Sequence, residues 1–260
     1  MPDLFPYPLE WFQAYLLIFT RIASTITFMP VLGGTGIPGQ VKAGLAAITA
    51  GVIFPFVDRA PVVMDVDVLV MAVMVAQEAL TGAATAMMVN LILSIVQLAG
   101  SMIDFQVGFG IVNVVDPVSG AQVSVTTQIL NITTTLIFLA VNAHHMALAG
   151  VMNSFSAIPL GGAHFNAGIT ELFMRTMSGV FLSGAQIAAP VTIALLLQQA
   201  AMGLVARTVP QINIFVVGFP FTISVGLLTL AFTLPAFSQY MQRTFEFMGR
   251  NMETLYGLMR

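Results

Sequence analysis

One long stretch of this chain carries no charged residue, which limits the folds that the chain can adopt. Between Asp116 and Glu171 lie 54 consecutive residues without Asp, Glu, Lys or Arg, and residues 176–206 and 208–242 also lack them. Only 7% of the chain is charged and 58% is hydrophobic, whereas soluble domains carry about 25% charged residues. Apolar stretches of this length are typical of membrane segments or of the dry interior of a large assembly.

Six long apolar segments follow one another along the chain. They span about 9–30, 42–54, 66–99, 121–152, 171–207 and a sixth stretch that ends near 234. A backbone in lipid must satisfy its own hydrogen bonds, so that only helices or a closed barrel are suitable. Barrel strands need short segments of alternating polarity, whereas these segments are continuous and of helix length. We therefore predict an all-α membrane protein, with a kink at Pro190.

Small residues recur four positions apart in several segments, for example Ala79 and Ala83 beside Gly82. This spacing places them on one helical face, where two backbones can approach closely. The same residues also suit ordinary membrane-helix composition, so both interpretations stay open at each single position. Taken together they favour tight packing between helices.

No linker divides residues 1–238, which we expect to form one helical domain. Residues 239–260 differ, because apolar residues recur there with heptad-like spacing and charged residues occupy the other faces. The apolar stripe consists of Met241, Phe245, Met248, Met252, Leu255 and Met259. Such an amphipathic helix lies on a membrane surface, docks on a partner or covers its own protein. The N-terminus lacks the basic start of a cleaved signal, so we expect the first segment to stay in the mature protein.

The composition also argues against several functions. The net charge is −3 and no Lys/Arg cluster occurs, so nucleic-acid binding is not expected. Cysteine is absent, which excludes disulfides and thiol chemistry. His144 and His145 are adjacent and would point about 100° apart on a helix, so they do not form a chelating pair, and His164 lies in a Gly-rich loop. We expect no enzyme activity, no cofactor and no metal site.

Three charged residues lie in or beside the apolar segments, namely Arg21, Glu78 and Asp104. An ionisable group in apolar surroundings is costly and tends to face the protein interior. Such groups either help protons to move or persist as buried structural pairs. The sequence does not show which residue pairs with which.

Several motifs in a fixed order resemble one protein family. They are GSMIDFQVGFG at 100–110 followed by Asp116-Pro117, NAHH at 142–145, and PQINIFVVGFP at 210–220. This set resembles the FliR family of flagellar type III export-gate proteins, over about residues 11–237. The His-His pair departs from the Gly-His expected in many relatives, so we attach no role to it.

The resemblance implies a structural and gating subunit of the flagellar protein export channel, in the bacterial inner membrane at the flagellar basal body. It implies long helical hairpins in a helical hetero-oligomeric assembly with the membrane subunits FliP and FliQ, and with FlhB wrapped against it. Unfolded flagellar subunits would be its transient partners. The injectisome counterparts share the central region, but the 210–215 motif favours the flagellum. A secondary transporter and a membrane-embedded enzyme are the rival classes, and no inverted repeat or cluster of chemistry-bearing residues favours them.

The resemblance also implies a plug between two long helices. By position it falls on residues 107–120, where glycines provide hinges and apolar side chains provide bulk that excludes water and ions. The expected plug residues are Val107, Gly108, Phe109, Gly110, Ile111, Val112, Val114, Val115, Asp116, Pro117 and Gly120.

Overall fold

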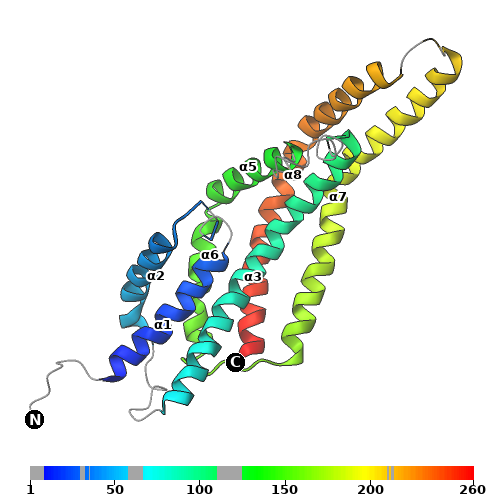
Figure 1. Cartoon of the computed structure of the whole chain (residues 1–260). Helices are drawn as coiled ribbons and strands as arrows, with labels where there is room; N and C mark the ends of the chain where they lie inside the picture. The colour runs from blue at the N-terminus through cyan, green and yellow to red at the C-terminus, as the bar shows by residue number, and fades with distance from the viewer. Residues whose placement is uncertain are drawn as a thin grey trace, which may run out of the picture. The chain divides into compact units, whose positions relative to one another are not determined.

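The computed structural model describes residues 9–29, 33–34, 36–57, 67–109, 125–209, 211 and 214–260. All regular elements in these ranges are helical (Figure 1). They are α1 (Leu9–Phe28), α2 (Gly39–Ile53), the short 3-10 helix η1 (Phe54–Phe56), α3 (Val68–Val107), α5 (Val125–Ala140), α6 (Ala143–Ala157), α7 (Ala167–Thr208) and α8 (Ile214–Met259). The predicted all-α fold is confirmed.

Four stretches of the described chain are long and apolar enough to cross a membrane, and a bent pair formed by α5 and α6 adds a fifth if it counts as one span. The helices α3, α7 and α8 contain 40, 42 and 46 residues. At 1.5 Å per residue each is roughly 60 Å long or more, about twice the ~30 Å hydrocarbon core. This length and composition agree with the predicted membrane protein.

The fourth apolar segment differs from the prediction. We expected one helix from about 121 to 152, but α5 ends at Ala140 and α6 begins at Ala143. Between them Asn142 has a φ of 55°, in the left-handed region. This conformation is incompatible with a continuous right-handed helix, and Asn tolerates it better than most residues.

The expected end of the sixth segment near residue 234 is wrong, because α8 continues through Pro235 to Met259. Pro220 also lies within α8, and Pro190, the position of the predicted kink, lies within α7. Residues 239–259 therefore continue α8 and do not start a new helix. Whether 1–238 and 239–260 are separate domains stays a prediction.

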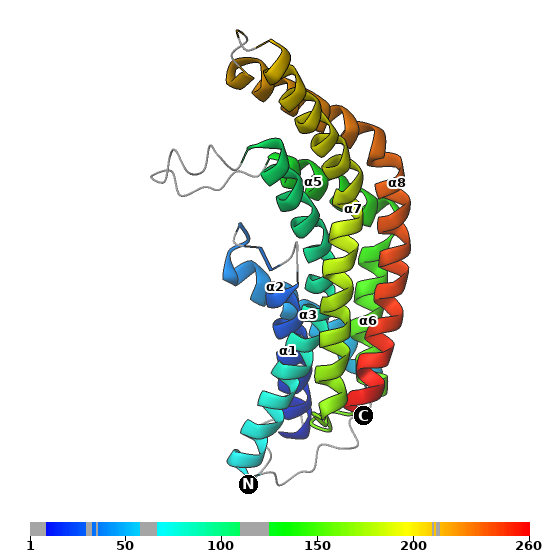
Figure 2. The same ribbon diagram turned by 90° about the vertical axis from the view of Figure 1, so that its right-hand side faces the viewer.

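The chain divides into two compact units. Unit 1 comprises Met1–Leu91, Asn142–Thr176 and Glu246–Arg260. In it α1 and α2 lie side by side (Figures 1 and 2), and the Tyr15 hydroxyl donates to the carbonyl of Ala47 at 3.0 Å. Apolar residues of α1 and α2 share one core with residues of α6, including Leu17, Ile18 and Phe155.

Unit 2 comprises Ile92–Val141 and Met177–Phe245. Its parts of α7 and α8 form a helical hairpin, in which the Thr222 hydroxyl donates to Gln198 Oε1 at 3.2 Å. The end of α3 packs against both arms. Gly184 of α7 leaves room for Leu98, and Gly226 of α8 leaves room for Val107, since a Cβ atom at these glycines would lie 2.8 and 2.7 Å from those side chains.

Many large apolar side chains remain exposed. Those more than 60% exposed include Phe181, Leu182, Leu197, Leu204, Val216 and Phe232 of α7 and α8. Water-soluble monomers rarely expose apolar patches of more than a few hundred Å². These surfaces fit a chain that lipid or other subunits cover.

Candidate functional site

The best-defined polar site lies in unit 1, where α1 and α3 bring Arg21 and Glu78 together. The Arg21 Nε group donates to Glu78 Oε2, and Nη2 donates to Oε1 at 2.9 Å. The two side chains are 1% and 0% exposed. Two parallel hydrogen bonds of this kind give a bidentate pair, which is the strong geometry for arginine and a carboxylate.

The remaining donors of Arg21 reach the end of α6. Its Nη1 group donates to the carbonyl oxygens of Ser154 at 3.0 Å and Ile158 at 3.2 Å, and Nη2 also donates to Ile158 at 3.2 Å. Carbonyl groups at a helix C-terminus lack intrahelical partners and carry partial negative charge. The Ser154 carbonyl also accepts from the backbone N–H of Ile158 at 2.9 Å, so the guanidinium adds a second hydrogen bond there and binds the Ile158 carbonyl that follows α6. Its central carbon also lies 4.4 Å from the centroid of the Phe155 ring, a cation–π distance.

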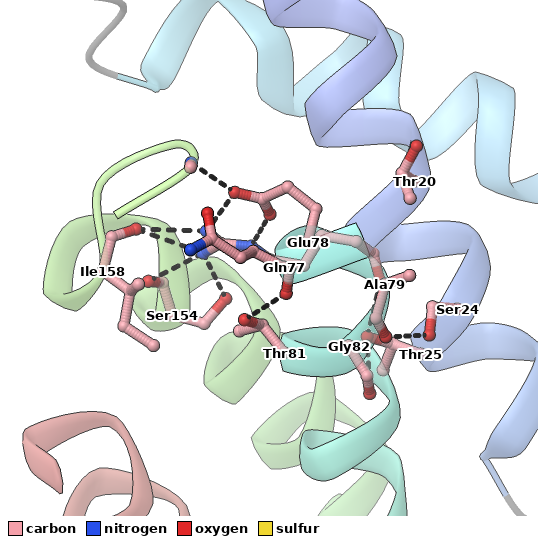
Figure 3. A network of polar contacts seen from close by, with 12 residues as sticks. Thr20, Ser24, Thr25, Gln77, Glu78, Ala79, Thr81, Gly82, Ser154 and Ile158 are labelled. Carbon is pink, nitrogen blue, oxygen red and sulfur yellow. Dashed lines mark hydrogen bonds and ion pairs between the residues drawn. The ribbon is translucent and has the colours of Figure 1, made fainter. Parts of the chain in front are cut away.

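Glu78 is held from a second side by the turn that follows α6. Figure 3 shows Glu78 of α3 pointing toward this turn, where Ile158 lies. The backbone N–H of Gly161 donates to Glu78 Oε1 at 2.8 Å. Gly161 has a φ of 67°, which glycine adopts without strain. Gly161 belongs to the same Gly-rich loop as His164, and no pattern in the sequence connects it with Glu78.

Next to this pair the backbones of α1 and α3 approach each other closely. The Ser24 hydroxyl of α1 donates to the carbonyl of Ala79 on α3 at 2.6 Å, as Figure 3 shows. A Cβ atom on Gly82 would lie only 2.3 Å from the carbonyl oxygen of Arg21. The predicted tight packing at this group of small residues is confirmed. A second group of small residues four positions apart, in α2, consists of Ala43, Ala47 and Gly51. At Gly51 a Cβ atom would meet nothing within 4 Å.

The hydrogen-bond network around Arg21 connects three helices, α1, α3 and α6. One positive and one negative charge are buried together, and their hydrogen bonds end on each other and on backbone groups of α6 and the following turn. Such a network specifies which helix surfaces meet. The sequence predicted that buried charges persist by pairing, but Arg21 and Glu78 lie 57 positions apart, so only the fold identifies the partners.

The third predicted charge, Asp104, lies in unit 2 and binds the start of a helix. It is in the last turn of α3 and is 5% exposed. Its carboxylate accepts hydrogen bonds from the backbone N–H groups of Thr126 at 3.0 Å and Thr127 at 3.3 Å. The Thr127 hydroxyl donates to the same carboxylate at 3.3 Å. Both threonines are in the first turn of α5, so Asp104 joins the two helices that flank the predicted plug.

The expected plug residues are only partly described. Val107 ends α3 and is 1% exposed, and Gly108 follows with a φ of 94°. Phe109 is half-buried. The remaining expected plug residues, Gly110, Ile111, Val112, Val114, Val115, Asp116, Pro117 and Gly120, lie outside the described residues.

The apolar stripe at the C-terminus is buried. All six stripe residues defined above are at most 1% exposed, so this helix covers its own protein. In unit 1 Met252 lies against Gly150 of α6, where an added Cβ atom would be 2.4 Å from its methyl carbon. The carbonyl groups of Leu258 and Met259 accept hydrogen bonds from the Asn166 side chain and the His164 backbone, both at 2.8 Å.

The described residues include no group of three or more His, Asp or Glu side chains placed to hold a metal ion. His145 lies in the first turn of α6, and His164 lies in the loop that precedes α7. Both histidines are exposed.

Comparisons with known protein sequences identify the family of this chain. The model of the family described as bacterial export proteins, family 1, matches residues 12–248. The flagellar biosynthetic protein FliR of Bacillus subtilis (strain 168) is 34% identical over 253 residues, which cover 96% of this chain and 97% of the relative. FliR of Escherichia coli (strain K12) is 30% identical, with 92% and 90% covered. FliR of Aquifex aeolicus (strain VF5) is 28% identical, with 91% of each chain covered.

These relatives carry flagellar names, which agrees with the choice of the flagellar over the injectisome branch. The family match includes residues of both units and of every helix described above, and the Bacillus subtilis relative covers 96% of the chain. On this evidence the chain belongs to the bacterial export proteins, family 1, together with flagellar biosynthetic proteins FliR.

Proposed function

We propose that this chain is a non-enzymatic gate and scaffold subunit of the flagellar type III protein export channel in the bacterial inner membrane. The observation that carries the proposal is the family match over residues 12–248, with relatives named for flagellar biosynthesis that align over nearly their full length. The long apolar helices support a location in the membrane-embedded part of the export apparatus.

Residues 107–120 act as the plug of this channel in our proposal. Val107 is buried against the Gly226 position of α8, which fixes the point where the segment leaves α3. Gly108, with its positive φ, gives the chain freedom to turn there. The apolar residues beyond it, from Phe109 to Val115, suit a barrier that blocks ions through the cost of removing their water.

The exposed apolar faces of α7 and α8 support assembly with other membrane subunits. We assign FliP, FliQ and FlhB as these partners, with lipid on the remaining surface and unfolded flagellar subunits as transient occupants of the channel. The C-terminal stripe is not available for this purpose, because its own chain buries it. A contact between residues 239–260 and FlhB would therefore use the polar faces of that helix, where Arg243, Glu246, Arg250 and Glu253 lie.

The transporter alternative depended on buried charges as ion or substrate sites. Arg21 and Glu78 instead direct their hydrogen bonds to each other, to backbone groups of α6 and the following turn, and to the Ser154 hydroxyl. Asp104 accepts hydrogen bonds from the first turn of α5. These arrangements favour a structural role for the three charges over a substrate site.

The plug is tested by replacing residues 109–120 with a Gly/Ser segment of the same length in the complete export gate, so that the buried Val107 at the end of α3 is kept. The replacement keeps the connection between α3 and α5 but removes the apolar bulk. We expect the gate to assemble and the membrane to leak small ions. Potassium flux from vesicles that contain the purified gate measures the leak, and co-purification with FliP and FliQ measures assembly.

A matched control replaces an exposed polar residue away from the plug. Glu171→Gln is suitable, because Glu171 is 63% exposed and its partner Arg175 is 77% exposed, and such surface pairs contribute little. An intact complex whose flux equals that of the wild type after the loop replacement would contradict the plug assignment. Failure to co-purify with other export subunits would contradict the scaffold assignment.

A further inference from the structure

The two helices that flank the proposed plug are joined directly at its base. Asp104 in the last turn of α3 accepts hydrogen bonds from Thr126 and Thr127 in the first turn of α5. These partners lie 22 and 23 positions further along the chain. The join therefore closes the ends of the whole intervening segment.

The chemistry of this join is that of a helix cap supplied from another helix. The first N–H groups of a helix have no partner within it, and those of the second and third residues are the groups that capping oxygens usually serve. Thr126 and Thr127 are the second and third residues of α5. A carboxylate at this end is also favoured by the helix dipole, and the low exposure of Asp104 limits competition from water.

A second contact, one helical turn earlier, holds the same two helices together. Gly100 of α3 lies against Thr127 of α5, and an added Cβ atom would be 2.4 Å from the Thr127 hydroxyl oxygen and 2.6 Å from its Cα atom. Only a residue without a side chain permits this approach without displacement of the backbone. The two helices are thus in backbone contact where the carboxylate joins them.

A third contact fixes the α3 side of the base. Val107 fills the space left by Gly226 on α8, where an added Cβ atom would be 2.7 Å from Val107 Cγ2. Asp104 and Val107 are three positions apart and therefore neighbours on one side of the helix. The side of α3 that faces α5 and α8 is occupied at successive turns by Gly100, Asp104 and Val107.

We infer that Asp104 is a positioning residue of the gate, which clamps the start of α5 to the end of α3 and so fixes both ends of the plug. This inference rests on the proposed plug function. The clamp holds the first turn of α5 against the last turn of α3, and its loss would let the start of α5 separate from α3.

The test compares Asp104→Ala, which removes both acceptor oxygens, with Asp104→Asn, which keeps one acceptor but no charge. Both are made in the complete gate, with Glu171→Ala and Glu171→Gln as matched surface controls. Hydrogen bonds to charged groups are strong enough that their loss changes an equilibrium about ten-fold or more. We therefore expect potassium flux to rise about ten-fold for Asp104→Ala, less for Asp104→Asn and not at all for the controls.

A distance measurement provides a readout that simple destabilisation would not reproduce. The chain contains no cysteine, so spin labels attach only at introduced Ser101→Cys and Ile132→Cys, two exposed positions on α3 and α5. We expect one narrow distance distribution when Asp104 is present and a broad one when the labelled chain also carries Asp104→Ala. Labels on Gln186→Cys and Ser224→Cys, exposed polar positions on α7 and α8, should keep their distribution.

The two proposals fail in different ways. If the Gly/Ser replacement leaks but Asp104→Ala leaves both the flux and the label distances unchanged, the clamp is wrong and the plug stands. A broadened distribution without added flux also overturns the positioning role. If the Gly/Ser replacement itself does not leak, the plug fails, and the label distances still show whether Asp104 joins the helices.

Discussion

Two buried carboxylates, one in each unit, are held in opposite ways. Glu78 of unit 1 is 0% exposed and faces a full positive charge on Arg21, from which it accepts a bidentate pair of hydrogen bonds. Asp104 of unit 2 is 5% exposed and faces the N–H groups that start a helix. One carboxylate is neutralised by an ion, the other by backbone dipoles.

The different partners of the two carboxylates indicate different roles. The network around Arg21 joins α1 to α3 and α6 across 57 and 133 positions of sequence, so it specifies the fold of unit 1. The bonds of Asp104 join helices on either side of one segment, 22 positions apart. We therefore expect damage at Glu78 to affect folding, and damage at Asp104 to affect the gate with a smaller loss of stability.

The largest expected effect is at Glu78. Glu78→Ala leaves the Arg21 guanidinium buried without its opposite charge, and breaking one side of a buried pair costs about 3–5 kcal/mol. We expect little folded protein in detergent and a strongly reduced thermal midpoint. Size-exclusion recovery after stepwise heating measures the loss.

The matched variant replaces both partners. Arg21→Met together with Glu78→Leu removes the two charges at once, and such replacements of a buried pair are often neutral. We expect the double variant to be clearly more stable than Glu78→Ala alone. Equal thermal midpoints for the two variants would contradict the view that the uncompensated charge is the cause.

Substitution of glycines at helix contacts should cause an intermediate loss of stability in both units. Gly82→Val in unit 1 and Gly100→Val in unit 2 force a side chain against the backbone of α1 or α5, and overpacking of this kind costs about 1–3 kcal/mol. Gly179→Ala on α7 meets nothing within 4 Å and should be neutral or slightly stabilising. Thermal midpoints of the three variants, measured in the same detergent, test this order.

The variants Gly100→Val and Gly82→Val also test whether the two units have different roles. Gly100→Val should raise potassium flux through the gate, because it moves α5 away from the clamp. Gly82→Val should lower the amount of assembled gate without a change in flux for each complex. The opposite pattern would show that we have exchanged the roles of the two units.

The smallest expected effect lies at the break between α5 and α6. Asn142 has a φ of 55°, and a left-handed conformation costs about 1–2 kcal/mol for residues that do not tolerate it. Asn142→Ala should therefore lower stability by about 1 kcal/mol, whereas Asn142→Gly should be close to neutral. A denaturant titration followed by circular dichroism resolves the order, and equal stability of the two variants would show that the backbone there is not strained.

Much of the fold could be predicted from the pattern of apolar residues. The expected segments at 66–99 and 171–207 correspond to α3, which continues to Val107, and to α7. Of the three possibilities left open for the apolar stripe from Met241 to Met259, the structure shows burial by its own chain. The break at Asn142 was missed because polar residues alone do not mark it: Asn131 and Thr133 lie in the same stretch, within the unbroken helix α5. The continuation of α8 through Pro235 was missed because a helix with neighbours accommodates a proline that an isolated pattern does not.

The sites were predictable by residue type but not by partner. A buried charge in an apolar segment signals a required partner, and this argument found Arg21, Glu78 and Asp104. The groups that satisfy them are mainly backbone atoms, such as the carbonyl of Ile158 and the N–H of Gly161. Every residue carries such atoms, so no side-chain pattern marks them, and only the fold brings them within reach.

The proposed function depends most on whether residues 107–120 line the route of exported proteins. A photo-activated crosslinker in place of Phe109 tests it, in cells where an unfolded flagellar subunit is stalled during export. We expect crosslinks between this position and the stalled subunit, and none when the export channel is empty. Crosslinks only to lipid or to other gate subunits in both states, with the subunit shown to be stalled in the same complexes, would contradict the account.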